Sequence, residues 1–576
     1  MYLEEYKRWL AADLEDADLN PELARIEGND EEIKDRFAVS LKFGTAGLRG
    51  VLGAGTNRMN IYVVRRATQG LANYIIKQGA ANKGVAIAYD SRHMSPEFAM
   101  EAAMTLAANG IKAYKFESLR PTPELSFAVR ELGCVAGINI TASHNPPEYN
   151  GYKVYWEDGA QFTPPHDKGV TEEVLAIEDL STVKTTDEAS ATAAGLYQVI
   201  GQEIDDKYIA QVKAQVVNQK AIDEMQDQIT IVYTPLHGTG NIPARRVMKE
   251  IGFTHVYVVP EQELPNGDFP TVSYPNPEAK EAFELGLKLA KEKDADLVLA
   301  TDPDADRLGV YVKDTKSGEY IPLTGNMSGS LLCEYVLSQK QAAGKIPADG
   351  QVVKSIVSTN LIDAVAKSYG AELIEVLTGF KWIGKQILKN ETTGHGTYLF
   401  GMEESYGCLI GTYARDKDAI SATAALCEAA AYYKQKGMTL WDAMIAMYEK
   451  YGYYKDAVKA IGLSGIEGLA KIQSIMETLR NNTPTEVGGY KVTSARDYKL
   501  DTIKNMATGE VKPTGLPSSN VLYYDLEDGA WICVRPSGTE PKIKFYFGVK
   551  GTSLKDAEEK ENALGAAVMA MVDKMM

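Results

Sequence analysis

The sequence predicts an α/β protein with three related α/β domains, mixed and largely parallel sheets, and a smaller C-terminal α+β domain around one central cleft. Three observations support this class. Apolar strand-like runs alternate with amphipathic helical segments, this order recurs three times, and each pass ends in a polar loop after a strand. Ligands bind at the carboxyl ends of the strands in open α/β sheets, so the three loops are expected to share one cleft.

The elements follow from the hydrophobic pattern. The first pass has strands at 85–89, 111–116 and 135–140 and helices at 96–109 and 124–132. The second has strands at 229–232, 255–259 and 297–300 and a helix at 244–251. The third has strands beginning at 356 and at 373–376 and 398–400, with a helix at 361–368. The last region has an apolar run at 531–533, an alternating strand at 543–547 and a long helix from about 554. The domains are expected to span 1–208, 209–324, 325–452 and 453–576.

Composition excludes several classes of partner. The chain has 576 residues, a net charge of -17 and 45% hydrophobic residues, so a nucleic-acid or acidic-membrane partner is not expected. The first ten residues lack the apolar core of a signal peptide, and no run of 18 apolar residues exists. The five cysteines are scattered without a Cys-x-x-Cys pair, which predicts buried thiols in a reduced, cytoplasmic protein.

Three carboxylates stand at every second position in Asp302-Pro303-Asp304-Ala305-Asp306-Arg307, directly after an apolar run. Pro303 opposes a helix, and side chains two apart in an extended segment point the same way, so the carboxylates are expected to converge on a divalent cation. An EF-hand is excluded, because Arg307 and Lys313 stand where its glycine and last carboxylate belong. Mg²⁺ assisting a phosphate, with Arg307 as a further phosphate partner, fits the pattern. Taken alone, the motif is also compatible with a solvated acidic turn.

Ser143 lies in the polar loop 141–147, after a strand and beside His144. It is either a nucleophile or a turn former, and alone the turn interpretation is favoured, because Ser and Asn are common in turns. A Ser-His-Asp triad stays open, although Thr141 and Asn145 stand where a nucleophile elbow has glycines. No Walker loop is present, so ATP-dependent kinase chemistry has no support.

Four further features suit an anionic, hydroxylated ligand. Arg49 lies in a glycine-punctuated loop, and Lys153 follows Ser143 by ten residues, although each has a simpler interpretation as an ordinary turn or surface residue. The segment Arg535-Pro536-Ser537-Gly538-Thr539 offers a guanidinium, two hydroxyls and backbone N–H groups, which favours phosphate binding. Glu403 and Ser405, in the polar loop expected at 401–407, are typical of a sugar-binding pair, because a carboxylate accepts hydrogen bonds from vicinal hydroxyls.

Together these motifs closely resemble the α-D-phosphohexomutase superfamily, in particular its phosphoglucomutase and phosphopentomutase branch, over essentially the whole chain. Thr-Ala-Ser-His-Asn-Pro at 141–146 is similar to the phosphoserine loop, and 302–307 is similar to the metal loop. Glu403-x-Ser405 matches the sugar-binding motif, and 535–539 matches the phosphate loop of the fourth domain. The four motifs stand in the family's order.

The resemblance implies a role for each residue. Ser143 would be the catalytic phosphoserine, Mg²⁺ would be held by Asp302, Asp304, Asp306 and an oxygen of the seryl phosphate, and His144 would support the loop. Arg49 and Lys153 would assist charge stabilisation and proton transfer, which calls for a lowered pKa of Lys153. The sugar phosphate would meet these residues: Arg307, Thr378, Gly379, Lys381, Glu403, Ser405, Arg535, Ser537, Gly538 and Thr539.

The implied reaction interconverts glucose 1-phosphate and glucose 6-phosphate, with glucose 1,6-bisphosphate as intermediate and activator. Met402 and Tyr406-Gly407 depart from phosphomannomutase-like members, which weakens a mannose assignment without deciding between hexose and pentose. A phosphopentomutase is therefore the alternative. A phosphoserine-type phosphatase and a non-catalytic sugar-phosphate binding protein are the rival classes. Small sugar phosphates are the expected partners of a monomer or weak homo-oligomer.

Overall fold

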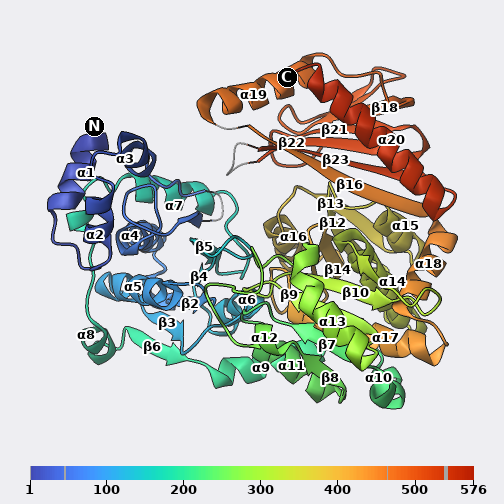
Figure 1. Ribbon diagram of the computed structural model, residues 1–576, viewed down its shortest axis with the longest axis horizontal. Coiled ribbons are helices and arrows are strands. Elements are labelled where there is room, and N and C mark those ends of the chain that lie inside the picture. Colours follow the sequence, from blue (N-terminus) through green and yellow to red (C-terminus); the bar gives the residue numbers. More distant parts are fainter. Residues whose placement is uncertain (1, 45–46, 464, 538–541) are drawn as a thin grey trace. The chain divides into compact units, whose positions relative to one another are not determined.

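The computed structural model describes residues 2–44, 47–463, 465–537 and 542–576. The chain divides into two compact units, each described by itself. The first comprises Met1–Thr324, Phe380–Phe400 and Ser405–Leu440, and the second comprises Gly325–Gly379, Gly401–Glu404 and Trp441–Met576. Figure 1 follows the chain from its blue N-terminal helices to its red C-terminal helix.

The first sheet of the first unit has the strand order β1-β5-β4-β2-β3-β6. Strand β2 is parallel to β4 and β3, and β3 to β6, whereas β5 is antiparallel to both β4 and β1. Every residue of β2 and β4 is buried, as expected of strands covered on both faces. The strands are β1 (Gly47–Val51), β2 (Val85–Tyr89), β3 (Ala113–Phe116), β4 (Ala136–Ile140), β5 (Tyr149–Trp156) and β6 (Tyr197–Ile200). The helices are α4 (Ile61–Lys77), α5 (Ser95–Ala108), α6 (Thr122–Glu131), α7 (His166–Leu175) and α8 (Glu188–Ala193), with η1 (Ala81–Lys83) and η2 (Leu180–Thr182).

Three short N-terminal helices form a separate small core of the first unit, visible in blue in Figure 1. They are α1 (Tyr2–Ala11), α2 (Leu19–Arg25) and α3 (Asp30–Phe37). Trp9 packs edge-on against Phe37 and against Tyr62 of α4. Arg65 of α4 reaches back to Glu15 at 2.7 Å, so the N-terminal segment contacts α4 through both apolar and charged side chains.

The second sheet of the first unit has the order β11-β10-β9-β7-β8, with β7 parallel to β8 and β9 and with β10 antiparallel to β9 and β11. The strands are β7 (Ile231–Thr234), β8 (Val256–Val258), β9 (Leu297–Thr301), β10 (Leu308–Lys313) and β11 (Tyr320–Leu323). The helices are α9 (Gln202–Lys213), α10 (Gln219–Met225), α11 (Asn241–Ile251), α12 (Pro260–Glu263) and α13 (Glu284–Lys293), with η3 (Gln226–Gln228) and η4 (Lys280–Phe283). This unit also holds α16 (Lys381–Thr393), β15 (Gly407–Leu409) and α17 (Ala419–Gln435), while β14 (Thr397–Glu403) runs from the first unit into the second.

The second unit contains the parallel pair of β12 (Gly350–Ser355) and β13 (Glu372–Val376), with α14 (Gly325–Ala342) and α15 (Leu361–Ser368). Its C-terminal part is an antiparallel sheet with the order β16-β23-β22-β21-β18-β19-β20 and β17 beside β18. Helix α20 packs against this sheet, in red in Figure 1. The strands are β16 (Tyr453–Gly462), β17 (Glu486–Val487), β18 (Tyr490–Asp497), β19 (Thr502–Asn505), β20 (Val511–Lys512), β21 (Leu522–Leu526), β22 (Trp531–Pro536) and β23 (Lys542–Gly551). The remaining helices are α18 (Leu440–Tyr451), α19 (Gly465–Asn481), η5 (Glu527–Gly529) and α20 (Leu554–Asp573).

The predicted α/β class and the smaller C-terminal α+β domain are confirmed, and the structure adds that the C-terminal sheet is antiparallel. One strand was wrongly started at Ile356, because β12 already ends at Ser355. The five cysteines are buried free thiols, as expected. Within the described residues, no helix has both the length and the apolarity needed to cross a bilayer. The four domain boundaries and the shared cleft stay predictions.

Candidate active site

Ser143 lies in the loop between β4 and β5, buried and with a left-handed backbone at φ 53. Its hydroxyl donates a hydrogen bond to Asp302 Oδ2 at 2.6 Å, and its Oγ lies 3.2 Å from His144 Nδ1. The backbone N–H of Ser143 is satisfied by Thr141 Oγ1 at 2.8 Å. The serine of the first domain and an aspartate of the second are therefore direct partners.

The three predicted aspartates follow β9 and do converge: carboxylate oxygens of Asp302, Asp304 and Asp306 lie within 4.8 Å of one another. The predicted reason was wrong, because the segment is a tight turn with Ala305 at φ 49 and not an extended run. Asp302 Oδ1 stabilises this turn by accepting the N–H groups of Asp306 and Arg307, each at 3.1 Å. The three side chains therefore converge around the inside of a turn.

The donor set fits a hard cation. All three carboxylates are buried, with exposed fractions of 0 to 2%. Oδ1 of Asp304 and Oδ1 of Asp306 are buried and have no hydrogen-bond partner in the part of the chain that the structure describes. Unpaired buried carboxylate oxygens are costly unless a cation binds them, and oxygen ligands of this kind suit Mg²⁺ or Ca²⁺.

Two lysines partly balance the carboxylates. Lys153 Nζ lies 2.6 Å from Asp304 Oδ2 and 3.7 Å from Asp306 Oδ2, and Lys417 Nζ lies 3.2 Å from Asp306 Oδ2. Burial raises the pKa of Asp302 well above its ordinary value, and the charges of the other two aspartates raise it further. Burial would also raise the pKa of Asp304, but Lys153 outweighs it and holds that pKa below its ordinary value.

The expectation of a lowered pKa for Lys153 is wrong for this structure. Burial does lower the pKa of this lysine, but the charges of Asp304 and Asp306 outweigh burial and raise it above its ordinary value. Lys153 is therefore a buried ammonium ion paired with the carboxylate cluster.

The other predicted residues of the first unit surround the same loops. Arg49, on β1, donates to Asn145 Oδ1 at 3.0 Å, because the pairing of β1 with β5 brings it beside the serine loop. Arg307 donates to Glu278 Oε1 at 2.9 Å. Burial lowers the pKa of His144 well below its ordinary value, and the charges of Arg307 and Arg49 add to this, so His144 is a neutral ring beside Ser143 Oγ.

Sequence reasoning missed three contributors to this arrangement. Thr122, at the start of α6, donates its hydroxyl to Asp304 Oδ2 at 2.8 Å. Lys417 pairs with Asp306, and the buried Arg92 donates to the carbonyl oxygen of Ser143 at 2.6 Å. Arg92 follows strand β2, so the same rule that singled out the loop after β4 could have found it. Lys417 stands in the charged run 415–418, which carried no other signal.

The second unit holds part of the predicted sugar-binding set. Glu403 is buried, accepts the N–H of Gly379 at 2.7 Å, and ends strand β14 instead of lying in the predicted loop. Thr378 Oγ1 is buried and lacks a hydrogen-bond partner among the described residues, so it can still bind a ligand hydroxyl.

The predicted phosphate loop begins later than expected, because Arg535 and Pro536 are the last residues of β22. Ser537 follows the strand, and its N–H donates to the carbonyl oxygen of Lys542 at 2.7 Å. Gly538 and Thr539 lie outside the described residues. In the first unit, Lys381 begins α16 and Ser405 lies in the turn between β14 and β15.

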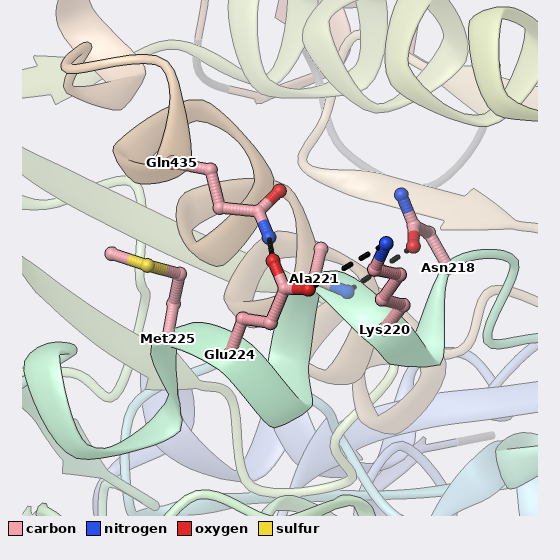
Figure 2. A pocket seen from close by; sticks show the side chains of 6 residues that line it. All are labelled: Asn218, Lys220, Ala221, Glu224, Met225 and Gln435. Carbon is pink, nitrogen blue, oxygen red and sulfur yellow. Dashed lines mark hydrogen bonds and ion pairs between the residues drawn. The ribbon is translucent and has the colours of Figure 1, made fainter.

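A surface pocket of about 560 Å³ beside α10 contains none of the predicted site residues (Figure 2). Gln435 of α17 donates to Glu224 there at 2.5 Å, and Figure 2 shows both side chains above the helix. This pocket is a crevice between α10 and α17. Its lining, within the described residues, is mixed and polar and contains no cluster of carboxylates comparable with Asp302, Asp304 and Asp306.

Four family models match the chain in sequence order. They are the phosphoglucomutase/phosphomannomutase α/β/α domains I, II and III, over residues 40–181, 206–318 and 324–451, and the C-terminal domain, over residues 486–564. The matches bear out the resemblance and the predicted arrangement of three α/β domains and one smaller domain.

Curated relatives extend the match over nearly the whole chain. A phosphoglucomutase of Staphylococcus saprophyticus is 36% identical over 534 residues, which cover 93% of this chain and 95% of that protein. A phosphoglucomutase of Staphylococcus epidermidis is 37% identical, with 90% and 92% covered.

Two solved structures share the fold at low identity. A phosphoglucomutase from Paramecium, pp63/parafusin, has a TM-score of 0.68 at 19% identity and covers 93% of this chain and 95% of its own. A putative phosphomannomutase from Thermus thermophilus has a TM-score of 0.67 at 21% identity, with 93% and 99% covered. From its domain content and its relatives, this protein belongs to the phosphoglucomutase/phosphomannomutase family.

Proposed function

We propose that this protein is a phosphosugar mutase that interconverts α-D-glucose 1-phosphate and glucose 6-phosphate through a phosphoserine at position 143. The observation that carries the proposal is the 2.6 Å hydrogen bond from Ser143 Oγ to Asp302, inside a cluster of buried carboxylates in which two oxygens lack a hydrogen-bond partner among the described residues. Relatives at 36 to 37% identity carry the name phosphoglucomutase, which supports glucose over the pentose alternative.

Asp302, Asp304 and Asp306, with an oxygen of the seryl phosphate, would hold Mg²⁺. When bound, the cation would neutralise charge on the transferring phosphoryl group and favour its in-line transfer. The Oδ1 atoms of Asp304 and Asp306, which are buried and lack a hydrogen-bond partner among the described residues, support this assignment.

The chain's own residues would divide the remaining work. The phosphoryl group passes from Ser143 Oγ to a sugar hydroxyl, and the hydroxyl proton ends on the serine oxygen in the net reaction. The resulting bisphosphate then returns its other phosphoryl group to Ser143. Lys153, a buried ammonium, and Arg49 would stabilise negative charge, while the neutral His144 ring beside Oγ supports the loop. Arg307 would be a further phosphate partner.

Sugar recognition is proposed for five residues, and the phosphate that does not react is assigned to the segment from Arg535 to Thr539. The buried Glu403 carboxylate and the unpartnered Thr378 hydroxyl support the sugar role. The five sugar-binding residues are Thr378, Gly379, Lys381, Glu403 and Ser405.

Incubation of the purified protein with glucose 1-phosphate, Mg²⁺ and a trace of glucose 1,6-bisphosphate tests the proposal. Glucose 6-phosphate should form, and it should form faster with the bisphosphate than without it. Release of inorganic phosphate alone would instead identify a phosphatase, and binding without turnover would identify a sugar-phosphate binding protein. A parallel assay with ribose 1-phosphate and deoxyribose 1-phosphate decides between hexose and pentose.

A further inference from the structure

Arg92 lies in the segment between β2 and α5, and its side chain binds the backbone of the serine loop. Its side chain is buried, with 1% of the residue exposed. Nη2 donates to the carbonyl oxygens of Ser143, at 2.6 Å, and of Asn145, while Nη1 donates to those of Pro146 at 2.8 Å and Tyr149 at 3.0 Å. One guanidinium therefore binds three carbonyl groups of the serine loop and that of Tyr149, the first residue of β5.

The guanidinium is itself held from two sides. Its Nε lies 3.3 Å from Asp90 Oδ2, and Asp90 Oδ1 accepts the N–H of Arg92 and the hydroxyl of Ser95, each at 2.9 Å. The ring of Phe269, from the second domain, lies 5.0 Å from the guanidinium carbon. A planar fork with fixed donor directions suits this position, and the single ammonium of a lysine cannot reproduce it.

The loop needs such support because Ser143 has φ 53, a conformation that a residue with a Cβ rarely adopts. Strained backbone at functional sites persists only where its surroundings determine it fully. Here Thr141 holds the N–H of Ser143 and Arg92 holds its carbonyl oxygen, so both sides of the residue are fixed. This conformation directs Oγ to Asp302 at 2.6 Å.

We infer that Arg92 is a positioning residue for phosphoryl transfer, which holds Ser143 in its reactive backbone conformation by binding the carbonyl groups of residues 143–149. The inference rests on the proposed role of Ser143 as the phosphoryl carrier. Arg92 acts through the loop and does not contact the reacting atoms.

The test measures the capture of a phosphoryl group by dephosphorylated enzyme from glucose 1,6-bisphosphate, by rapid quench and intact-protein mass spectrometry. In this step the donor's P–O bond breaks, a bond from phosphorus to Ser143 Oγ forms, and the serine proton ends on the released sugar oxygen. Arg92→Lys keeps the charge but loses the fork, so its capture rate at saturating donor should fall about 100-fold, the scale expected for a reacting group misplaced by about 1 Å. The donor concentration giving half the maximal rate should change less than about threefold, because ligand-binding groups are untouched.

Arg65→Lys is the matched control, because Arg65 is also buried and ion-paired but lies on α4 against Glu15 and Glu101. It should lose thermal stability without losing capture rate. Arg92→Ala should regain part of its capture rate with millimolar guanidinium, and less with methylammonium. A capture rate for Arg92→Lys within threefold of the wild-type rate would overturn the inference.

Two further outcomes distinguish a failure of the proposed function from a failure of the role of Arg92. If wild-type enzyme takes up no phosphate, or Ser143→Ala takes up as much, the proposed function fails and not the role of Arg92. If the Arg92 variants do not fold, Asp90→Asn takes their place, because it removes the counter-charge of Arg92 and keeps the side-chain shape. A capture rate at least tenfold below wild type then supports the inference, and an unchanged rate overturns it.

Discussion

Thr122 binds Asp304 twice, with its backbone N–H to the carbonyl oxygen and its hydroxyl to Oδ2, both at 2.8 Å. Asn139 of β4 in turn donates to Thr122 Oγ1 at 2.7 Å. The start of α6 in the first domain is thereby joined to the aspartate loop of the second. Ser143 and the carboxylates thus have fixed relative positions within the first unit.

Metal binding should stabilise the fold, because the cation would relieve the repulsion among three buried carboxylates. At a Mg²⁺ concentration about 100-fold above Kd, the gain should be about 2.7 kcal/mol, measured as the rise in Tm when Mg²⁺ is added to protein that EDTA treatment has first freed of metal. Asp304→Asn should lose most of this rise and raise the Mg²⁺ requirement of turnover. Asp227→Asn, at an exposed carboxylate, is the control. An unchanged metal titration in Asp304→Asn would argue against the metal role.

Ser143→Ala should abolish turnover, because it removes the hydroxyl that is proposed to carry the phosphoryl group. Activity should fall below about 0.1% of wild type, in line with the loss of a covalent nucleophile. The variant should keep the wild-type Tm within about 2 °C, since one hydroxyl hydrogen bond is worth about 1 kcal/mol. Ser190→Ala, at an exposed serine of α8, should retain full activity. Near-normal turnover of Ser143→Ala would remove the basis for the mechanism.

Lys153→Met should leave Asp304 without its ammonium partner. Removing one member of a buried ion pair costs about 3 to 5 kcal/mol, so urea unfolding should detect a large loss of stability. Because the carboxylates then carry more uncompensated charge, Mg²⁺ should stabilise Lys153→Met more than it stabilises the wild type. Lys153→Arg keeps the charge and is the control. An equal response to Mg²⁺ in Lys153→Met and wild type would contradict this account of the electrostatics.

Gly238→Ala should displace the aspartate loop, because an added Cβ would lie only 2.4 Å from Pro303 Cα. Overpacking of this kind costs about 1 to 3 kcal/mol, and Mg²⁺ affinity should fall with it. At Gly462 an added Cβ would meet only Lys542 Cγ at 3.9 Å, so Gly462→Ala is the matched control. Thermal unfolding with and without Mg²⁺ measures both effects, and an unaltered Mg²⁺ response in Gly238→Ala would refute the prediction.

Lys381→Met should change the ratio of kcat/KM values between glucose 1-phosphate and pentose 1-phosphates more than it changes Tm. Burial lowers the pKa of this lysine, which marks a partly desolvated ammonium. Lys385 provides the control, because it lies over the same Trp382 ring, at 5.5 Å against 5.4 Å for Lys381, and was not assigned to the site. Equal losses on all substrates would count against a role in specificity.

Much of the first unit followed from periodicity alone. Buried runs such as 85–89 and 136–140 are apolar on both faces, so both strands and the loops after them could be located. The convergence of Asp302, Asp304 and Asp306 was also predicted, but from an extended segment, whereas the structure has a buried turn. The geometry of this turn depends on the left-handed backbone of Ala305, at φ 49, and on backbone N–H groups that donate to Asp302. The spacing of the aspartates in the sequence reveals neither feature.

Partners far apart in sequence were beyond prediction. The direction of the pKa shift of Lys153 was predicted wrongly, because it depends on how closely Asp304, 151 residues away in the sequence, approaches the lysine. The position of Arg92 after a strand was visible in the sequence, but its four partners were not, because they are carbonyl groups, which every residue possesses. Glu403 was expected in a loop, because it begins the polar sequence 403–406, and polarity alone does not show that β14 continues to Glu403.

The two hydrogen bonds between Thr122 and Asp304 determine how the enzyme could be divided into fragments. A fragment that ends before Asp302 would retain the serine loop but would lose the carboxylate that Ser143 contacts and the partner that Thr122 binds. Such a fragment would be chemically inert even if every strand of its sheet formed. If the first two domains are expressed as separate polypeptides, phosphoryl capture should therefore require that they reassociate, because neither domain alone holds both Ser143 and the carboxylates.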